Sequence, residues 1–261
     1  MIANRFGGYL FDLDGVIYVG DEPVDNSVET IRRLRNDGSS IGFVTNTASK
    51  TREDVVSKLG ELGIEATVDE IVTAGWATAR YLDQNDYTSV YLIGQDGLPT
   101  EVQRQGIRMN EHDAEAVVVG SDYSFNYSKL KRATRLIHDE QLPFIATNLD
   151  PSFPTTSGIS PGTGAIVSAV QTATGEPPTV IGKPQSAVYE LALEKMETDR
   201  VAMLGDTLVT DIKGANDIGL FSILLSKHQR ENKQASDDIR PDIVLDDVSE
   251  LFARDLDLST E

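Results

Sequence analysis

The chain has 261 residues, of which 39% are hydrophobic and 25% are charged, so it can bury one large core or two modest ones. Its formal net charge of -19 argues against nucleic acid and anionic lipid as partners, because an acidic surface repels both. The absence of cysteine excludes disulfides, thiolate metal sites and a cysteine nucleophile.

No apolar run in the sequence is long enough to span a bilayer, and the N-terminal residues lack the pattern of a signal peptide. We therefore expect a cytoplasmic protein with no membrane partner. The acidity, with arginine outnumbering lysine, is also compatible with adaptation to a high-salt cytosol, where charge is screened.

Buried strands and amphipathic helices are predicted to alternate along the chain. A strand over 8–13 precedes a helix whose apolar face holds Val28, Ile31 and Leu34. A strand over 41–44 precedes a helix that opens with a capping box from Thr51 to Asp54. Further strands are predicted at 90–93, 116–119, 144–146, 180–181, 201–204, 221–225 and 243–245. This alternation predicts an α/β fold, with a Rossmann-like parallel sheet as the core and helices on both faces.

The first chemical motif is Asp12-Leu13-Asp14-Gly15, directly after the first predicted strand. Two carboxylates two residues apart, just past a strand, can approach one site, and Gly15 lets the backbone pass close to a ligand. An ordinary strand-ending Asp-Gly turn is an equally good explanation of this motif alone.

The second motif is Thr45-Asn46-Thr47, directly after the strand over 41–44. A hydroxyl, an amide and exposed backbone N–H groups at a strand-to-helix junction suit an anion. Taken alone, the motif is better explained as a helix N-cap.

The third motif is Gly182-Lys183-Pro184, before a helix through Val188 and Leu191. A lysine at a helix N-terminus opposes the macrodipole unless an anion lies between them, which favours a phosphate partner. An exposed loop lysine is the alternative.

The fourth motif runs from Gly205 to Asp211, after the strand over 201–204. Asp206 is expected at the strand tip, and Asp211 lies about one helical turn farther on. Hard divalent cations prefer such oxygens, and magnesium takes one or two protein carboxylates. N-capping by Asp206 or Thr207, with Asp211 as a first-turn acid, is the alternative.

Three of the motifs follow predicted strands, and the lysine opens a helix beside the same edge of the sheet. In open parallel sheets, ligands bind at the carboxyl ends of the strands. Carboxylates, phosphate donors, a lysine and a metal site together form the set that phosphoryl transfer requires. The combination favours that chemistry over four unrelated helix caps.

In this motif order the sequence resembles the haloacid dehalogenase superfamily. The span after Asp14 is too short for a cap domain, and about a hundred residues separate the second and third motifs instead. This resembles the class IIA branch, whose members carry a large inserted α/β cap. That branch contains the NagD-like and 4-nitrophenyl phosphatase-like proteins. Residues 146–150, Pro154 and 161–164 also resemble that branch. The resemblance implies a catalytic core over 1–77 and 180–261 and a cap over 78–179.

The resemblance implies a Mg²⁺-dependent phosphatase of small phosphorylated metabolites. Asp12 is the expected nucleophile, forming an aspartyl-phosphate, and Asp14 the expected general acid and base. Magnesium is expected on Asp12, the backbone carbonyl of Asp14 and Asp206, with Asp211 in support. The residues expected to bind the phosphoryl group are Thr45, Asn46, Thr47 and Lys183.

The sequence also departs from the family pattern. Relatives often carry a second asparagine and then serine after Thr45-Asn46, where this chain has Thr47 and Ala48. In the cap, Phe153 occupies a position where some relatives have a polar substrate contact. Asn148, Asp150 and Phe153 are the expected cap contacts to substrate.

Three alternatives remain beside the phosphatase. A phosphomutase or phosphotransferase would return the phosphoryl group to a product, but such members carry a helical cap in the first loop. A catalytically silent binding module would have lost one of the motif residues, whereas this chain has all of them. A nucleotide-binding dehydrogenase is disfavoured because no Gly-x-Gly-x-x-Gly follows the first strand.

The substrate stays open among sugar phosphates, nucleoside monophosphates, aryl phosphates, phosphoglycolate and pyridoxal phosphate. A homo-oligomer formed through the cap is compatible with family analogy.

Overall fold

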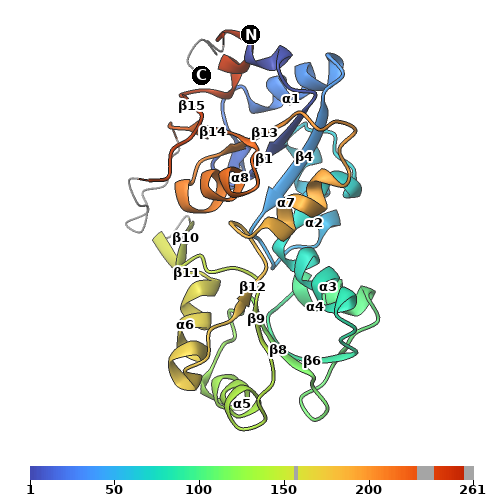
Figure 1. Cartoon of the computed structure of the whole chain (residues 1–261), viewed down its shortest axis with the longest axis vertical. Coiled ribbons are helices and arrows are strands. Elements are labelled where there is room, and N and C mark those ends of the chain that lie inside the picture. Colours follow the sequence, from blue (N-terminus) through green and yellow to red (C-terminus); the bar gives the residue numbers. More distant parts are fainter. Residues whose placement is uncertain (156–157, 228–237, 256–261) are drawn as a thin grey trace. The chain divides into compact units, whose positions relative to one another are not determined.

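The computed structural model describes residues 1–155, 158–227 and 238–255. The chain divides into two compact units (Figure 1). The first unit comprises residues 1–45, 56–72 and 189–261, and the second comprises residues 46–55 and 73–188. The expected boundaries of core and cap stay a prediction.

The first unit is built around a six-stranded sheet whose strands have the order β15-β14-β13-β1-β4-β5. Its central strand β1 pairs in parallel with β13 on one side and β4 on the other. The bounds are β1 (Gly8–Phe11), β4 (Ser40–Thr45), β5 (Ile71–Thr73), β13 (Val201–Gly205), β14 (Phe221–Leu225) and β15 (Ile243–Leu245). The strands predicted for this sheet are confirmed, and β5 was not predicted.

Helices and short turns complete the first unit. The helices are α1 (Ser27–Asn36), α8 (Lys213–Asp217) and parts of α2 (Arg52–Glu61) and α7 (Ser186–Leu193). The shorter elements are η1 (Ile2–Asn4), η2 (Val68–Glu70), η4 (Val248–Phe252), the π-helical turn η3 (Leu208–Ile212), and the hairpin of β2 (Tyr18–Val19) and β3 (Glu22–Pro23).

The predicted capping box at the start of α2 is confirmed. The Thr51 N–H donates to the Asp54 carboxylate at 2.9 Å, and the Asp54 N–H donates to the Thr51 hydroxyl at 3.1 Å. Two backbone donors of the first turn are thereby satisfied.

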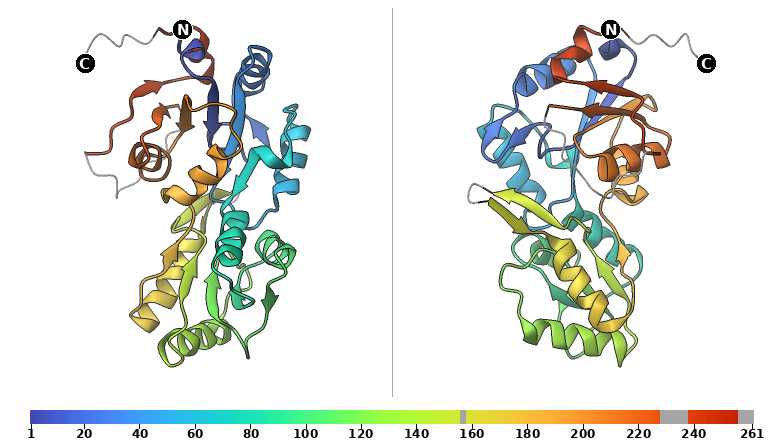
Figure 2. Two further views of the ribbon diagram at one scale, coloured as in Figure 1. Left: turned by 45° about the vertical axis from the view of Figure 1, so that its right-hand side comes forward. Right: turned by 90° about the vertical axis from the view of Figure 1, so that its left-hand side faces the viewer.

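The second unit contains a five-stranded parallel sheet of order β12-β9-β8-β6-β7. The strands are β6 (Ser89–Ile93), β7 (Arg108–Met109), β8 (Ala116–Val119), β9 (Phe144–Ala146) and β12 (Thr179–Val180). The helices are α3 (Ala74–Gln84), α4 (Gly97–Arg104), α5 (Tyr127–His138) and α6 (Thr163–Thr174). Helices α5 and α6 cover one face of this sheet, and α3 and α4 lie on the other (Figure 2).

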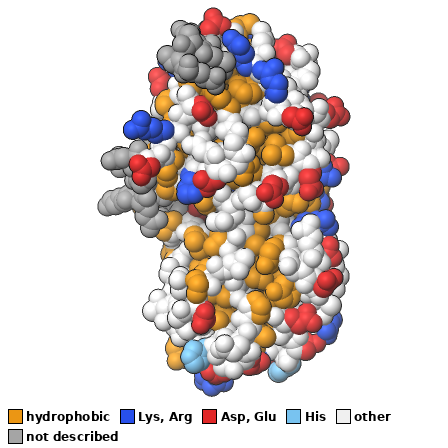
Figure 3. All heavy atoms as spheres, viewed as in Figure 1, with side chains coloured by type: hydrophobic (Ala, Val, Ile, Leu, Met, Phe, Trp, Pro, Cys, Tyr) orange, Lys and Arg blue, Asp and Glu red, His pale blue; other side chains and the backbone are white. Residues whose placement is uncertain are grey.

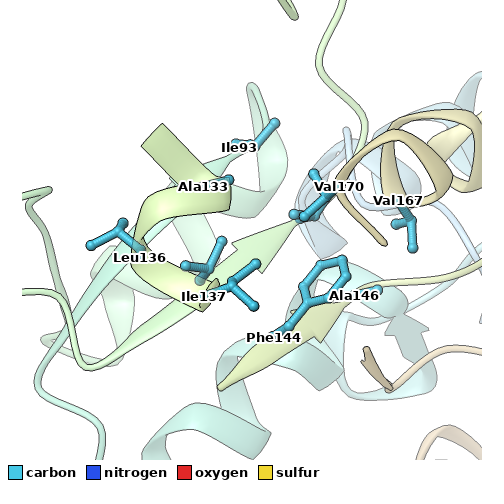
Figure 4. Close-up of a cluster of buried hydrophobic side chains, with 10 residues drawn as sticks. Ile93, Ala133, Leu136, Ile137, Phe144, Ala146, Val167 and Val170 are labelled. Carbon is cyan, nitrogen blue, oxygen red and sulfur yellow. The ribbon is translucent and has the colours of Figure 1, made fainter. Parts of the chain in front are cut away.

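The core of the second unit lies between the sheet and the helices α5 and α6 (Figure 4). Ala133, Leu136 and Ile137 extend from α5 toward Val167 and Val170 of α6, and all five are buried. Their spacing of three to four residues places them on one face of each helix, which explains why these sequences form amphipathic helices here.

The structure of the second unit differs from the sequence pattern in the segment 150–164. Its richness in proline, glycine, serine and threonine indicates a loop, but it contains an antiparallel hairpin of β10 (Ser152–Thr155) and β11 (Gly158–Pro161). Its proline and glycine content conceals the strand pattern, because these residues usually mark turns. Helices α3 and α4 and strand β7 were not predicted. In the described part of the chain, every helix is too short or too polar to cross a membrane.

Candidate active site

Three buried aspartates come together at the carboxyl ends of two adjacent strands of the first unit. The Asp12 N–H donates to the carbonyl of Leu204 at 2.9 Å, so Asp12 directly continues the pairing of β1 with β13. Asp206 directly follows β13. One carboxylate oxygen from each of Asp12, Asp206 and Asp211 lies within 4.8 Å of the other two. Their exposed fractions are 7%, 0% and 0%.

Two glycines give these carboxylates room. Gly15 has a φ of +91°, and a Cβ there would lie 2.8 Å from the carboxylate carbon of Asp206. A Cβ at Gly205 would lie 2.6 Å from a carboxylate oxygen of Asp211. Contacts this close are not tolerated between non-bonded heavy atoms. The close approach of the three carboxylates therefore depends on glycine at both positions.

The turn η3 directs Asp211 back toward the strand ends. Its carboxylate accepts a hydrogen bond from the Thr207 N–H at 3.0 Å, and the Thr207 hydroxyl donates to Asp206 at 2.8 Å. Tyr189 donates its hydroxyl to the carbonyl of Thr210 at 2.8 Å and so holds the turn. The Thr207 side chain makes no N-cap hydrogen bond, so the helix-cap explanation of this motif does not apply to it. π-Helical turns often occur at functional sites.

Asp14 follows Asp12 in a tight turn. The carbonyl of Leu13 accepts hydrogen bonds from the N–H groups of Val16, Ile17 and Tyr18, and the Gly15 N–H donates to the Tyr18 carbonyl at 2.8 Å. The Asp14 side chain is half-buried. Within the described residues, the group of three carboxylates does not include Asp14, so a role as metal ligand would use its backbone carbonyl, as expected.

Thr45 is the last residue of β4, the neighbour of β1, and is buried. Because β4 runs parallel to β1, Thr45 lies at the same edge of the sheet as Asp12. The Thr47 hydroxyl lies 3.4 Å from that of Ser49.

Asn46, Lys183 and Asp150 form a second group, within the second unit. The Lys183 N–H donates to the Asn46 carbonyl oxygen at 2.8 Å. The Asn46 amide donates to the Lys183 carbonyl at 3.2 Å and to the Asp150 carboxylate at 3.1 Å. Asn148 donates to the same carboxylate oxygen at 2.7 Å. The Lys183 side chain is buried.

Phe153, the third expected cap contact, borders a cavity of about 540 Å³ in the second unit. The Phe153 ring lies 6.4 Å from that of Tyr123, centroid to centroid. The cavity lining includes Ser121, Tyr123, Phe125, Phe153, Pro161 and Ile166.

Asp122 also borders this cavity. Burial raises the pKa of its carboxyl, but hydrogen bonds from Lys129 and Ser124 outweigh that effect and lower the pKa below its ordinary value. Asp122 therefore stays a carboxylate at neutral pH, paired with Lys129.

The sequence placed Gly182 and Gly205 in the predicted motifs but did not indicate what each of them does. A third residue, outside both groups, was not predicted at all. Glu101 of α4 is fully buried, and its carboxylate accepts from the Arg52 N–H at 3.1 Å at the start of α2. Nothing in the sequence around Glu101 indicates this role.

The comparisons with known proteins agree with this geometry. The family model described as haloacid dehalogenase-like hydrolase matches residues 9–108, and one described as HAD-hydrolase-like matches residues 180–251. These spans contain all four motifs.

Two curated relatives are similar over most of their length. An acid sugar phosphatase of Staphylococcus haemolyticus is 37% identical over 224 residues, which cover 84% of this chain and 85% of the relative. The 5'-nucleotidase YutF of Bacillus subtilis is 34% identical over 251 residues, which cover 95% of this chain and 98% of the relative.

Solved structures show the same fold. The glycerol phosphate phosphatase of Mycobacterium tuberculosis, in complex with magnesium, has a TM-score of 0.88 and 33% identity, with 96% of this chain and 77% of that chain covered. NagD of Escherichia coli has a TM-score of 0.85 and 25% identity, with coverage of 94% and 98%.

The chain therefore belongs to the haloacid dehalogenase-like hydrolases. Within that family its relatives are phosphatases, and the enzyme class expected from the sequence, a hydrolase of phosphoric monoesters, is confirmed. The roles of single residues stay predictions.

Proposed function

We propose that this protein is a Mg²⁺-dependent phosphatase of small phosphomonoesters that acts through an aspartyl-phosphate on Asp12. The observation that carries the proposal is the group of Asp12, Asp206 and Asp211, buried and within 4.8 Å of one another. Three buried carboxylates so close together repel one another unless a cation lies between them.

The donor set fits magnesium, a hard cation that prefers oxygen ligands. Asp12, Asp206 and the backbone carbonyl of Asp14 would hold the ion, with Asp211 in support. When bound, the ion neutralises charge on the phosphoryl oxygens and on the carboxylates. The magnesium complex of the glycerol phosphate phosphatase supports this choice.

The reaction proceeds in two displacements. A carboxylate oxygen of Asp12 attacks phosphorus while the bond from phosphorus to the ester oxygen breaks, and Asp14 gives its proton to that oxygen. Asp14, now a carboxylate, takes a proton from water as the water oxygen attacks phosphorus. The bond between phosphorus and Asp12 breaks, which releases inorganic phosphate and restores both aspartates.

Lys183, Thr45 and Thr47 would bind the phosphoryl oxygens. A buried ammonium and hydroxyl donors stabilise the negative charge that spreads over these oxygens in the transition state. The burial of Lys183 and Thr45 supports the proposal, because electrostatic interactions are stronger away from water.

The substrate is a small phosphorylated metabolite, and the names of the relatives favour sugar phosphates and nucleoside monophosphates. The second unit would act as the cap expected over 78–179, with Asn148, Asp150 and Phe153 near the leaving group. An aromatic ring at position 153 suits the face of a sugar or a base.

The protein would work in the cytoplasm, and its acidity suits a high-salt interior. A homo-oligomer through the cap is compatible with five exposed apolar side chains among the described residues of the second unit. These are Met109, Tyr123, Tyr127, Leu149 and Ile159.

The first test is Asp12→Asn, which removes the nucleophile and keeps the shape of the side chain. We expect the rate of phosphate release from p-nitrophenyl phosphate with Mg²⁺ to fall at least about 10³-fold. Borohydride applied during turnover should label the native enzyme at position 12 and leave the variant unlabelled.

Asp21→Asn is the matched control, because Asp21 is fully exposed and pairs with Lys58 at 3.9 Å. It should keep full activity. Native turnover by Asp12→Asn would refute Asp12 as the nucleophile. Turnover without a covalent adduct would favour direct attack by water.

The second test concerns the metal. We expect chelation to abolish turnover and added Mg²⁺ to restore it. Mg²⁺ should also raise the melting temperature of the native protein, because a ligand that binds only the folded state stabilises it. Asp206→Asn should lose that shift, and an equal shift in both proteins would place the metal elsewhere.

A further inference from the structure

The Asn46 side chain has its polar groups engaged within the protein. Its carbonyl oxygen accepts from the Lys183 N–H at 2.8 Å. Its amide nitrogen donates two hydrogen bonds, to the Lys183 carbonyl at 3.2 Å and to the Asp150 carboxylate at 3.1 Å. An amide group has two donors, so no Asn46 side-chain donor remains for a phosphoryl oxygen.

Asn46 bonds to Lys183 in the way that one β-strand bonds to its neighbour. The Asn46 amide pairs with both the N–H and the carbonyl of the same residue, Lys183, as a neighbouring backbone would. It thereby fixes the position of the Lys183 backbone, from which the buried ammonium-bearing side chain extends.

Asp150 helps to fix the orientation of the Asn46 amide group. A carboxylate accepts hydrogen bonds and donates none, so the Asn46 nitrogen must face Asp150 and the Asn46 oxygen must face the Lys183 N–H. Asn148 donates to the same oxygen of Asp150 at 2.7 Å and holds it in place.

Gly182 leaves room for this arrangement. A Cβ at residue 182 would lie 2.6 Å from the Asn46 carbonyl oxygen and 2.5 Å from the Thr147 carbonyl. The Gly182 N–H donates to that Thr147 carbonyl at 2.7 Å. The glycine before Lys183 is thus explained by the approach of Asn46.

We propose that Asn46 and Asp150 are positioning residues that act through Lys183, and that neither side chain contacts the substrate. This inference rests on the proposed role of Lys183 in binding the phosphoryl group. It reassigns two side chains that the sequence placed on the substrate itself.

A double-mutant cycle tests the proposal. The variants are Asn46→Ala, Lys183→Met and the double variant, assayed with p-nitrophenyl phosphate and Mg²⁺ for kcat and KM. We expect Asn46→Ala to lower kcat/KM about 10- to 100-fold in the native background. In the Lys183→Met background it should lower kcat/KM less than about twofold, because a residue that acts through another adds nothing once that other is gone.

The possible outcomes of the cycle are distinct. An equal loss in both backgrounds would show that Asn46 contacts the substrate directly and would overturn the inference. Full activity of Lys183→Met would instead overturn the proposed role of Lys183, and with it this inference. Asn85→Ala is the matched control, since the exposed Asn85 side chain donates to the Tyr81 carbonyl at the end of helix α3; it should keep native kcat/KM.

Variants of Asp150 provide a second measurement. Asp150→Asn keeps an oxygen that accepts from Asn46 and Asn148, and we expect it to retain most of kcat/KM. Asp150→Ala removes that oxygen and should resemble Asn46→Ala. If both variants lose activity equally, the charge of Asp150 acts directly on the substrate and the positioning role is wrong. Melting temperatures of all variants show whether each is folded.

Discussion

Gly205 is the last residue of strand β13, directly before Asp206, and its missing side chain leaves the space in which the Asp211 carboxylate lies. We expect Gly205→Ala to displace the Asp211 carboxylate, because the new Cβ would lie 2.6 Å from one of its oxygens. The change should lower kcat/KM at least about tenfold and destabilise the fold by roughly 1–3 kcal/mol. Initial rates across a Mg²⁺ titration and urea unfolding measure both effects.

Gly60 offers a matched control for that substitution. It lies within α2, and a Cβ there would meet nothing within 4 Å. Gly60→Ala should stabilise the protein by about 0.5–1 kcal/mol, since alanine loses less backbone freedom than glycine in a helix. Full activity and an unchanged Mg²⁺ dependence of Gly205→Ala would contradict the role given to Gly205.

At the scale of single residues, the sequence predicted the carboxylates but not the contacts between them. Asp12 and Asp206 each follow a strand whose apolar run is plain in the sequence, so their edge of the sheet was predictable. Asp211 was expected in support of the metal site, but the π-helical turn over 208–212 that directs its carboxylate there is not visible in a residue pattern. The bonds of Asn46 join residues 137 positions apart, which no local pattern predicts.

The start of helix α2 is fixed by its capping box, and this makes the helix sensitive to acid. Hydrogen bonds from the Thr51 N–H and hydroxyl lower the pKa of the Asp54 carboxyl below its ordinary value. A lowered pKa means that Asp54 stabilises the fold above the unfolded-state pKa of about 3.9. That contribution is lost as the pH falls through the folded-state value.

We expect Asp54→Ala to cost about 1 kcal/mol at pH 7, the usual value of a helix cap. The difference from the native protein should shrink as the pH falls below about 4. Urea unfolding of both proteins between pH 7 and pH 3 measures it. Asp83→Ala is the control, because its exposed pair with Arg80 contributes little at any pH. A cost for Asp54→Ala that is independent of pH would show that the Asp54 charge has no part in the cap.

At the scale of elements, the sequence predicted long apolar runs better than short or mixed ones. Strands β8, β9, β14 and β15 have the predicted bounds because each is a short apolar run between polar residues. Helix α3 was missed because its sequence is rich in small and aromatic residues and all of its first six residues are buried. A helix buried on several sides has no clear amphipathic period.

At the scale of the whole molecule, net charge is the feature with the largest expected consequence. Forty-two acidic side chains against 23 basic ones repel one another in the folded state more than in the expanded unfolded chain. Acidic side chains are spread over the visible surface of the first and the second unit (Figure 3). Salt reduces this repulsion, because the screening length falls from about 10 Å at 0.1 M to about 3 Å at 1 M.

We therefore expect the free energy of unfolding to rise between about 0.1 M and 2 M KCl, opposite to the effect on a fold held by surface ion pairs. Urea unfolding at a series of KCl concentrations measures this dependence. Glu61→Lys combined with Glu176→Lys is the informative variant, since both side chains are exposed and lie far from the aspartate group in sequence. The less acidic variant should gain less from salt, because it has less repulsion to screen. An equal gain in both proteins would attribute the effect to general salting-out of apolar surface, and a loss of stability in salt would contradict the high-salt adaptation altogether.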